Sequence, residues 1–514
     1  MKNKIAFYPF LFAIFPVIFL YSHNIDEVSF NTIFIPLFVS LIITFLVRLI
    51  FMFSIKDKQK AALLTFLFVF AFFSYGHFVN LINNIVFKEI DISAIYLIIF
   101  WIILFISISI LVIKMRKNLG NATQILNIFV SALVLFSFSK IAIFHFSILN
   151  YPKSKIEISE DLKLSSEMSL KKEELPDIYY LIFDRYANSK TLKEYYGYDN
   201  SDFLNYLKEK GFYIASESKN NYPGSDLSLS SSLNMGYLDY LLEDGPVKKR
   251  VIYRLLQDFK VWRLLKSAGY KYFHFGSWWE ATRTNKYADY NFKGEGLVKL
   301  SQEFLLKFLE TTMLIHFSKG KLVSISHRER VLREFDELAK LPEMGAPKFV
   351  FSHLAIPHHP FVFGPDGENP RKKGPRKSRN EGYIDQLKFT NKKIKWLISE
   401  ILETSKSKPI IILQSDEGPG GEEFPVYKLM KLDKDRRTRA KYKIKRRILN
   451  AYYLPQINEN KLYKTITPVN TFRLIFNLYF GTNYELLEDK TYHAIRGRVL
   501  LRKFELVSPN MFVQ

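Results

Sequence analysis

The segment PDIYYLIFD, residues 176–184, decides the fold of the second part of the chain. Ile178 to Phe183 form an unbroken apolar run, and Asp184 follows it directly. A short apolar run bounded by polar residues is typical of a strand buried on both faces, as in a parallel sheet. We therefore predict a strand here. Three further runs have the same character, at 270–275, 348–355 and 409–414.

Helical patterns separate these four runs. Apolar side chains recur every three or four residues in 250–266 and in 383–402, and a leucine-rich pattern covers 227–242. Helices of this kind bury one face against a neighbouring layer. The alternation of strands and helices predicts an α/β domain with a mostly parallel central sheet.

Five long apolar runs occupy the first 150 residues. Each approaches or exceeds the roughly 20 residues that a helix needs to cross a bilayer core of about 30 Å. A cleaved signal peptide accounts only for the first run, and no small-residue cleavage site follows it. We therefore predict five transmembrane helices. The runs are Ile5 to Tyr21, Thr32 to Ile55, Ala61 to Val79, Ser93 to Ile113 and about Ile125 to Leu149.

Lysine and arginine residues mark one side of this membrane domain. Eight of them lie before the first run or in the second and fourth loops, whereas the other two loops carry only Lys88. Basic residues in short loops stay on the cytoplasmic side. We therefore predict a multi-pass protein of the cell (inner) membrane with its N-terminus inside. The predicted parts are a membrane domain (1–150), a juxtamembrane linker (151–174) and an extracytoplasmic domain (175–514).

Composition narrows the partners and the chemistry. The 514 residues are 48% hydrophobic and carry a formal charge of +23, of which +17 lies beyond residue 150. A basic domain outside the membrane meets anionic lipid and envelope polymer, so nucleic acid is not an expected partner. The chain has no cysteine, which excludes disulfides, thiolate metal sites and cysteine nucleophiles.

Polar side chains follow three of the predicted strands. Asp184 follows the first, His358 and His359 follow 348–355, and Asp416 and Glu417 follow 409–414. Ligands bind beyond the carboxyl ends of strands in an open parallel sheet. Each residue taken alone also fits a turn or a helix cap. Two adjacent carboxylates at a sheet edge favour a cation, because it offsets their repulsion.

Ser225 is the candidate nucleophile. It follows Tyr222-Pro223-Gly224 and precedes the leucine-rich helical pattern, so it lies at a predicted helix N-terminus. Free amide groups there stabilise an alkoxide or a phosphate. A simple N-cap role is the alternative. The rival hydroxyls are those of Ser228, Ser230, Ser231 and Ser232.

Together these motifs resemble the alkaline phosphatase and sulfatase superfamily. The order matches: the carboxylate after the first strand, the hydroxyl before a helix, His358-His359-Pro360-Phe361 and Ser415-Asp416-Glu417-Gly418. The resemblance covers about 175–485, including 467–481 near its end. With five preceding spans, the chain resembles the membrane-anchored branch, the lipoteichoic acid synthases and the lipid A phosphoethanolamine transferases.

The resemblance implies a reaction and roles for particular residues. These enzymes move a phosphoglycerol or phosphoethanolamine group from a membrane phospholipid to a cell-surface glycan or lipid. By position, Ser225 would be the nucleophile, and His358 would contact the phosphate or the leaving group. The implied metal ligands are Asp184, Ser225, Asp416 and Glu417. Additional substrate-binding candidates are His359, His274 and Arg283, because His274 lies near a predicted strand end and Arg283 could pair with a phosphate.

Two departures from the family pattern bear on the chemistry. The family uses threonine where this chain has Ser225, and usually shows Asp-His where it has Asp416-Glu417. An all-oxygen ligand set favours Mn²⁺, with Zn²⁺ or Mg²⁺ as alternatives. The formylglycine route of true sulfatases is excluded, because the chain lacks cysteine and Ser225 does not lie in the required motif.

Two basic tracts, 371–379 and 434–447, remain outside this scheme. They fit either a solvated surface or a contact with anionic lipid or glycan. Two other functions also remain open. One is a phosphodiesterase or phosphatase of the same fold, and the other is a degenerate relative that binds anionic envelope polymer.

Overall fold

The computed structural model describes residues 4–25, 28, 30–82, 94–116, 118–149, 175–277, 279–292, 302–314, 321–345, 347–370, 378–497 and 500–512. The predicted linker and most of the first basic tract therefore lie outside the described residues. The chain forms two compact units. The helical unit comprises Met1–Pro152 and Val298–Val323, and the α/β unit comprises Lys153–Leu297 and Ser324–Gln514.

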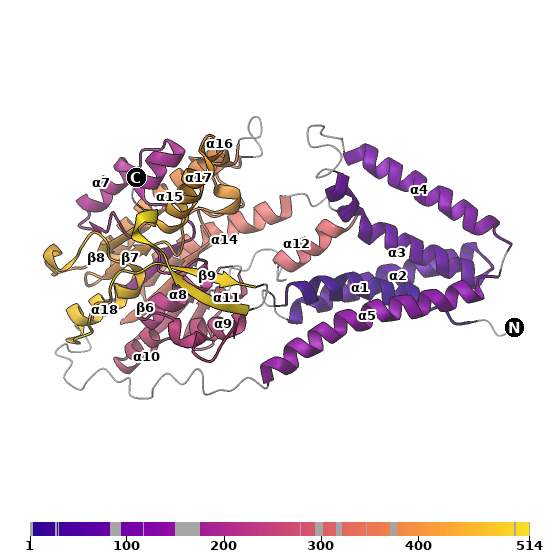
Figure 1. Ribbon diagram of the computed structural model, residues 1–514, viewed down its shortest axis with the longest axis horizontal. Helices are drawn as coiled ribbons and strands as arrows, with labels where there is room; N and C mark the ends of the chain where they lie inside the picture. Colours follow the sequence, from indigo (N-terminus) through magenta and orange to yellow (C-terminus); the bar gives the residue numbers. More distant parts are fainter. Residues whose placement is uncertain are drawn as a thin grey trace. The chain divides into compact units, whose positions relative to one another are not determined.

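Five helices of the helical unit coincide with the five apolar runs (Figure 1). Four of them are long and apolar enough to cross a membrane. The first has only 16 residues, a length of about 24 Å, so the fifth span stays a prediction. The helices are α1 (Tyr8–His23), α2 (Phe34–Ser54), α3 (Lys58–Leu81), α4 (Ala94–Lys114) and α5 (Gly120–Leu149).

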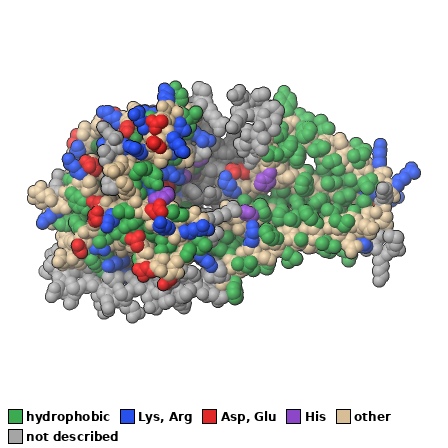
Figure 2. All heavy atoms as spheres, in the orientation of Figure 1, with side chains coloured by type: hydrophobic (Ala, Val, Ile, Leu, Met, Phe, Trp, Pro, Cys, Tyr) green, Lys and Arg blue, Asp and Glu red, His purple; other side chains and the backbone are tan. Residues whose placement is uncertain are grey.

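The surface of the helical unit is apolar. Figure 2 shows hydrophobic side chains over most of its visible face, and Phe38, Phe53 and Ile143 are each more than 60% exposed. A patch of this size on a protein marks contact with an apolar partner, and a bilayer matches the lengths of these helices.

A short helix from later in the chain belongs to the same unit. Helix α12 (Gln302–Thr311) packs against α1 and α3, and buries Phe304 and Phe308 in their aromatic cluster. The backbone of Glu310 approaches α3 so closely that a side chain at Gly76 would overlap it. No sequence pattern predicts this return of the chain, which lies within the predicted 175–514 domain.

The α/β unit is built on a seven-stranded sheet in the order β2-β8-β7-β1-β6-β4-β5. The pairs from β7 to β5 are parallel, and β8 and β2 continue the sheet antiparallel. This confirms the mostly parallel α/β fold. The strands are β1 (Ile178–Phe183), β2 (Tyr213–Ile214), β4 (Lys271–Phe275), β5 (Tyr290–Phe292), β6 (Lys348–Leu354), β7 (Ile410–Gln414) and β8 (Asn450–Tyr453).

Strand β1 shows why its apolar run is unbroken. Tyr179, Leu181 and Phe183 lie in one core cluster with residues of α7 (Ser201–Glu209), α14 (Lys321–Lys340) and α15 (Arg379–Thr404). The alternate residues of β1 lie in a second cluster with α8 (Ser225–Asn234), α10 (Lys260–Ser267) and α18 (Pro468–Tyr479). Helices thus cover both faces of the sheet, which requires apolar side chains at every position of its central strand.

Two predicted helices are shorter than their patterns. The 250–266 pattern divides into α9 (Lys249–Gln257) and α10, with Asp258 between them accepting two hydrogen bonds from Arg263, of 2.8 and 2.6 Å. The 227–242 pattern ends at Asn234, where Met235 takes a left-handed conformation. A small antiparallel sheet, β3 (Val247–Lys248), β10 (Leu500–Leu506) and β9 (Tyr492–Arg496), has no counterpart among the predictions.

Candidate active site

Three neighbouring strands bring one potential metal-binding side chain each to the same edge of the sheet. β1 lies between β6 and β7, with Ile182 level with both His353 and Gln414. Asp184 follows β1, His353 is the next-to-last residue of β6, and Asp416 lies just beyond β7. One oxygen or nitrogen atom from each of the three lies within 4.8 Å of the others. Parallel register therefore builds a three-residue cluster from three distant parts of the chain.

The cluster is buried, and three of its polar atoms lack hydrogen-bond partners in the described part of the chain. Asp184 is 8% exposed, His353 2% and Asp416 1%. Asp184 Oδ1, His353 Nε2 and Asp416 Oδ2 have no hydrogen-bond partner among the described residues. Burying such atoms without a partner is costly, and carboxylates without compensation are the most costly of all. Two carboxylates and one imidazole nitrogen fit a divalent cation, which would compensate all three.

Local contacts prepare this donor set. His353 Nδ1 lies 2.8 Å from the Thr282 hydroxyl, a hydrogen bond that orients the ring, and His353 Nε2 lies 3.7 Å from Asp416 Oδ2. With its proton on Nδ1, the ring donates to Thr282 and leaves the Nε2 lone pair available to a metal. Burial and the neighbouring Asp416 raise the pKa of Asp184 well above its ordinary value. Burial acts in the same direction on Asp416, but His353 and the Ser225 hydroxyl hold the pKa of Asp416 below its ordinary value. The two carboxyl groups thus differ in their affinity for protons.

Ser225 is the first residue of α8, beside the Asp416 carboxylate. The turn before it requires glycine, because Gly224 has φ of 79° and an added Cβ would lie 3.0 Å from Asp226 Oδ1. Arg496 from β9 braces this turn with bonds of 2.9 and 3.0 Å to the Asp226 carboxylate and of 2.8 Å to the Pro223 carbonyl. The candidate nucleophile is therefore held in place on both sides.

Glu417 points to a different set of partners. Its Oε2 accepts a 3.0 Å hydrogen bond from the Gly224 amide, and its Oε1 lies 3.4 Å from Arg185 Nη2. It is not part of the three-residue cluster. Arg185, with φ of 65°, also donates to the Gly420 carbonyl at 2.7 Å and to Glu423 at 2.6 Å. Glu417 thus links the nucleophile turn to a guanidinium, and its role as a metal ligand stays a prediction.

His358 and His359 lie beside this ion-pair network. The His359 amide donates a 2.9 Å hydrogen bond to Glu423, and the His358 ring bonds the His359 carbonyl through Nδ1. Desolvation, with a smaller effect of Arg185, lowers the pKa of His358 to about 4. A neutral imidazole at physiological pH accepts a proton rather than donating one. No sequence pattern pointed to Glu423, because it lies in a single 3-10 turn (Gly421–Glu423) that is too short to have a periodic pattern.

His274 and Arg283 are neighbours of Thr282 and are not part of the three-residue cluster. Both ring nitrogens of His274 are engaged, with Tyr272 Oη at 2.8 Å and the Thr282 carbonyl at 2.7 Å. Burial lowers the pKa of His274 to about 4. His274 therefore supports Thr282, the residue that orients His353. Arg283 is the last residue of α11 (Glu280–Arg283), next to Thr282. Their roles as substrate contacts stay predictions.

A buried glutamate that contacts β6, Glu334, makes the stability of the fold depend on pH. The Ser352 hydroxyl donates a 2.9 Å hydrogen bond to Glu334 on α14, and burial raises the pKa of Glu334 to about 8. The folded state therefore keeps a proton that the unfolded chain loses above about pH 4.3. The contribution of Glu334 to stability is largest at low pH and declines as pH rises toward 8.

We therefore expect Glu334→Gln to raise the unfolding temperature by a few degrees at pH 8.5 and to change it little at pH 4.5. Thermal unfolding of the detergent-solubilised protein at both pH values measures this. A variant that is less stable than wild type at pH 8.5 would contradict the assignment.

Comparison with solved structures returns membrane transferases and sulfatases. The zinc complex of the C-terminal periplasmic domain of EcEptC from Escherichia coli is 13% identical, covering 65% of this chain and 95% of that chain with a TM-score of 0.43. The integral membrane lipooligosaccharide phosphoethanolamine transferase A (EptA) from Neisseria meningitidis is 9% identical, covering 92% and 95% with a TM-score of 0.40. A putative sulfatase from Bacteroides fragilis is 11% identical, covering 63% and 77% with a TM-score of 0.37.

These solved structures are of the kinds that the sequence motifs resemble. No family model and no curated protein matches this sequence.

Proposed function

We propose that this protein is a membrane-bound, metal-dependent enzyme that transfers a phospholipid-derived headgroup to a cell-surface glycan or lipid. The observation that carries the proposal is the Ser225 hydroxyl beside a buried cluster of Asp184, His353 and Asp416, in which one oxygen or nitrogen atom of each lacks a hydrogen-bond partner within the described residues. A hydroxyl held against a divalent-metal site is the arrangement of an activated oxygen nucleophile. Four helices long and apolar enough to cross a membrane would anchor the protein in the bilayer that contains such a phospholipid donor.

The metal site comes from this cluster. Asp184, His353 and Asp416 would hold the ion, with Ser225 Oγ as a fourth donor. A bound divalent ion supplies Lewis-acid activation of the serine hydroxyl and of the phosphate oxygens. The expectation of Mn²⁺ came from an all-oxygen set; the nitrogen of His353 makes the set suitable for Zn²⁺ as well.

The reaction takes two displacements. In the first, Ser225 Oγ forms a bond to the donor phosphorus and the bond from phosphorus to the diacylglycerol oxygen breaks. The proton lost by Ser225 is balanced by the one that the diacylglycerol oxygen gains. In the second, an acceptor hydroxyl oxygen forms a bond to the same phosphorus, and the bond from phosphorus to Ser225 Oγ breaks. The acceptor proton passes to neutral His358, which returns it, so that Ser225 Oγ regains the proton it lost. Arg185 and Glu423 hold the loop that carries His358 and His359.

Location follows from the same proposal. The N-terminus would be cytoplasmic, five spans would cross the inner membrane, and the α/β unit would be extracytoplasmic. The transferred headgroup is phosphoethanolamine or phosphoglycerol. In the donor phospholipid each is part of a phosphodiester, which is the bond type that this reaction breaks.

Headgroup transfer is measured with the full chain in vesicles. We expect headgroup-labelled phosphatidylethanolamine or phosphatidylglycerol to release diacylglycerol only with a divalent metal, and the label to move to lipid or glycan acceptors in an envelope extract. The arm that reacts identifies the headgroup. Free labelled headgroup phosphate, formed equally without acceptor, would indicate the hydrolase instead. No turnover and no bound metal would favour the polymer-binding role.

A further inference from the structure

Helix α16 (Val426–Met430) exposes an unusual amount of apolar surface for the α/β unit. Tyr427 is 73% exposed, Met430 68% and Val426 50%. Among the described residues of this unit, no other large hydrophobic side chain is as exposed as Tyr427 or Met430. Leu429 is buried in a cluster with Ala440 and Ile444. The helix is thus anchored on one side and presents its other apolar side chains to the exterior.

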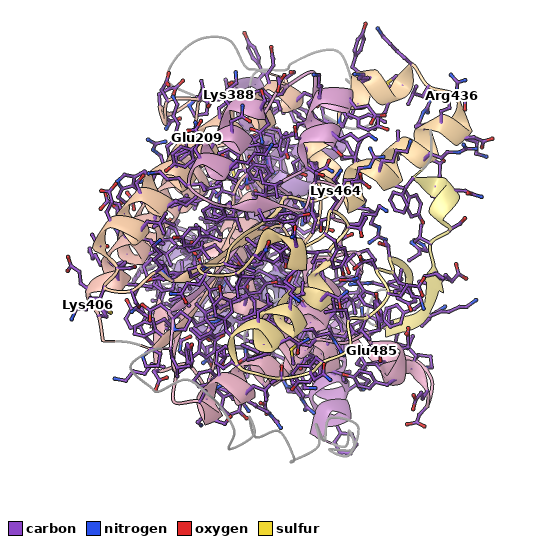
Figure 3. All side chains as sticks on the ribbon, turned by 90° about the vertical axis from the view of Figure 1, so that its left-hand side faces the viewer. Glu209, Lys388, Lys406, Arg436, Lys464 and Glu485 are labelled. Carbon is purple, nitrogen blue, oxygen red and sulfur yellow. The ribbon has the colours of Figure 1, made fainter. Side chains whose placement is uncertain are left out.

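Helix α17 (Lys434–Arg446) packs beside α16 and adds positive charge next to this apolar surface. Its buried face packs on Leu429, and Figure 3 shows Arg436 projecting outward from it at the edge of the unit. Asp433 is engaged at the helix N-terminus, where it accepts a 2.9 Å hydrogen bond from the Arg436 amide. The exposed basic residues of the two helices and of the turn between them are Lys428, Lys431, Lys434, Arg436, Arg439, Lys441 and Lys445.

Exposed apolar side chains within a cationic surface match the boundary of an anionic bilayer. The apolar tips gain by entering the acyl region, and each lysine or arginine gains by approaching anionic headgroups. An acidic polymer would satisfy the charges but leave Tyr427 and Met430 in water. The unit that carries this surface belongs to the same chain as the apolar helices, since β1 begins at Ile178 and α5 ends at Leu149.

We propose that α16 and α17 form a membrane-contact surface that binds anionic phospholipid bilayers. The surface lies next to the candidate active site along the chain: Glu423, three residues before α16, bonds Arg185 and the His359 amide. It would hold the site at the lipid surface. This contact does not depend on which group the site transfers, so it can be tested apart from the reaction.

The absence of cysteine allows a direct test. A single Met430→Cys variant of the full chain, labelled with an environment-sensitive fluorophore, is placed in nanodiscs of phosphatidylcholine with or without phosphatidylglycerol. We expect a blue shift and about twofold stronger quenching by doxyl-labelled lipid when phosphatidylglycerol is present. Raising the salt from about 0.1 M to about 1 M shortens the Debye length from about 10 Å to about 3 Å and should remove most of the difference.

Matched controls separate the causes. The control variant is Lys406→Cys, because Lys406 is exposed on another side of the unit (Figure 3). A fluorophore attached there should show no lipid quenching. Reversal to glutamate of Lys434, Arg439 and Lys441 should abolish quenching at position 430. Reversal of Lys208, Lys406 and Lys408 should not.

Two results would overturn the proposal. One is a label at position 430 that is equally exposed to water in neutral and anionic nanodiscs. The other is a blue shift without lipid quenching, which would mean that protein or polymer covers the surface instead.

Discussion

Replacing Asp416 by asparagine should remove divalent-metal binding. Asp416 is buried, its Oδ2 has no hydrogen-bond partner among the described residues, and it lies beside both His353 and Ser225. Losing one of two carboxylate donors removes charge that holds the cation. Removing a residue that only hydrogen-bonds a metal ligand typically lowers metal affinity by about 10- to 100-fold. Because Asp416 would bind the metal directly, we expect a larger loss of affinity. Metal content and titration calorimetry with Zn²⁺ and Mn²⁺ measure it.

The matched control is Glu417→Gln. Because Glu417 pairs with Arg185 and the Gly224 amide, its charge should matter less to the metal, with a loss of roughly tenfold or less, as for an outer partner. Both variants replace a carboxylate by the corresponding amide, at adjacent positions in the chain. If Glu417→Gln loses metal as completely as Asp416→Asn, then Glu417 is a ligand, as the resemblance implies.

Replacing Ser225 by alanine should abolish the covalent intermediate while leaving the metal bound. Removing a nucleophile of this kind typically lowers the rate by on the order of 10⁴-fold or more. The three residues of the cluster remain, so metal content should stay near that of wild type. Intact-protein mass spectrometry after incubation with phospholipid should show a headgroup phosphate adduct on wild type and none on the variant.

Ser228→Ala is the control for the rival hydroxyls. Ser230, Ser231 and Ser232 bond backbone carbonyls, whereas Ser228 Oγ has no hydrogen-bond partner among the described residues. The adduct should persist in this variant. An adduct that survives Ser225→Ala and disappears in Ser228→Ala would move the nucleophile by one helical turn.

The sheet was predictable because the sequences of its central strands indicate that both of their faces are buried. Residues 178–183 are apolar at every position, which only a strand covered on both faces requires. The rule that ligands follow strand ends then selected Asp184 and Asp416. The same rule overlooked His353, because this residue lies inside the 348–355 run rather than after it. An ionisable side chain near the end of a buried strand was the available signal.

Other residues of the site could not be predicted from local patterns. Arg496 braces the nucleophile turn from 270 positions away in the chain, on a strand of a sheet with no predicted counterpart. The contact of Glu417 with Arg185 depends on the left-handed turn after β1, which places an arginine where its sequence neighbours suggest only a loop. Such pairings arise from tertiary geometry, which one sequence does not encode locally.

The return of the chain through α12 limits how this protein can be divided. Phe304 and Phe308 are buried among aromatic residues of α1 and α3, although they lie between β5 and β6 in the sequence. A polypeptide beginning at residue 175 would carry these two phenylalanines without their partners and present them to water. A soluble catalytic fragment therefore requires replacing 298–323 with a polar connection, and not merely removing the N-terminal helices.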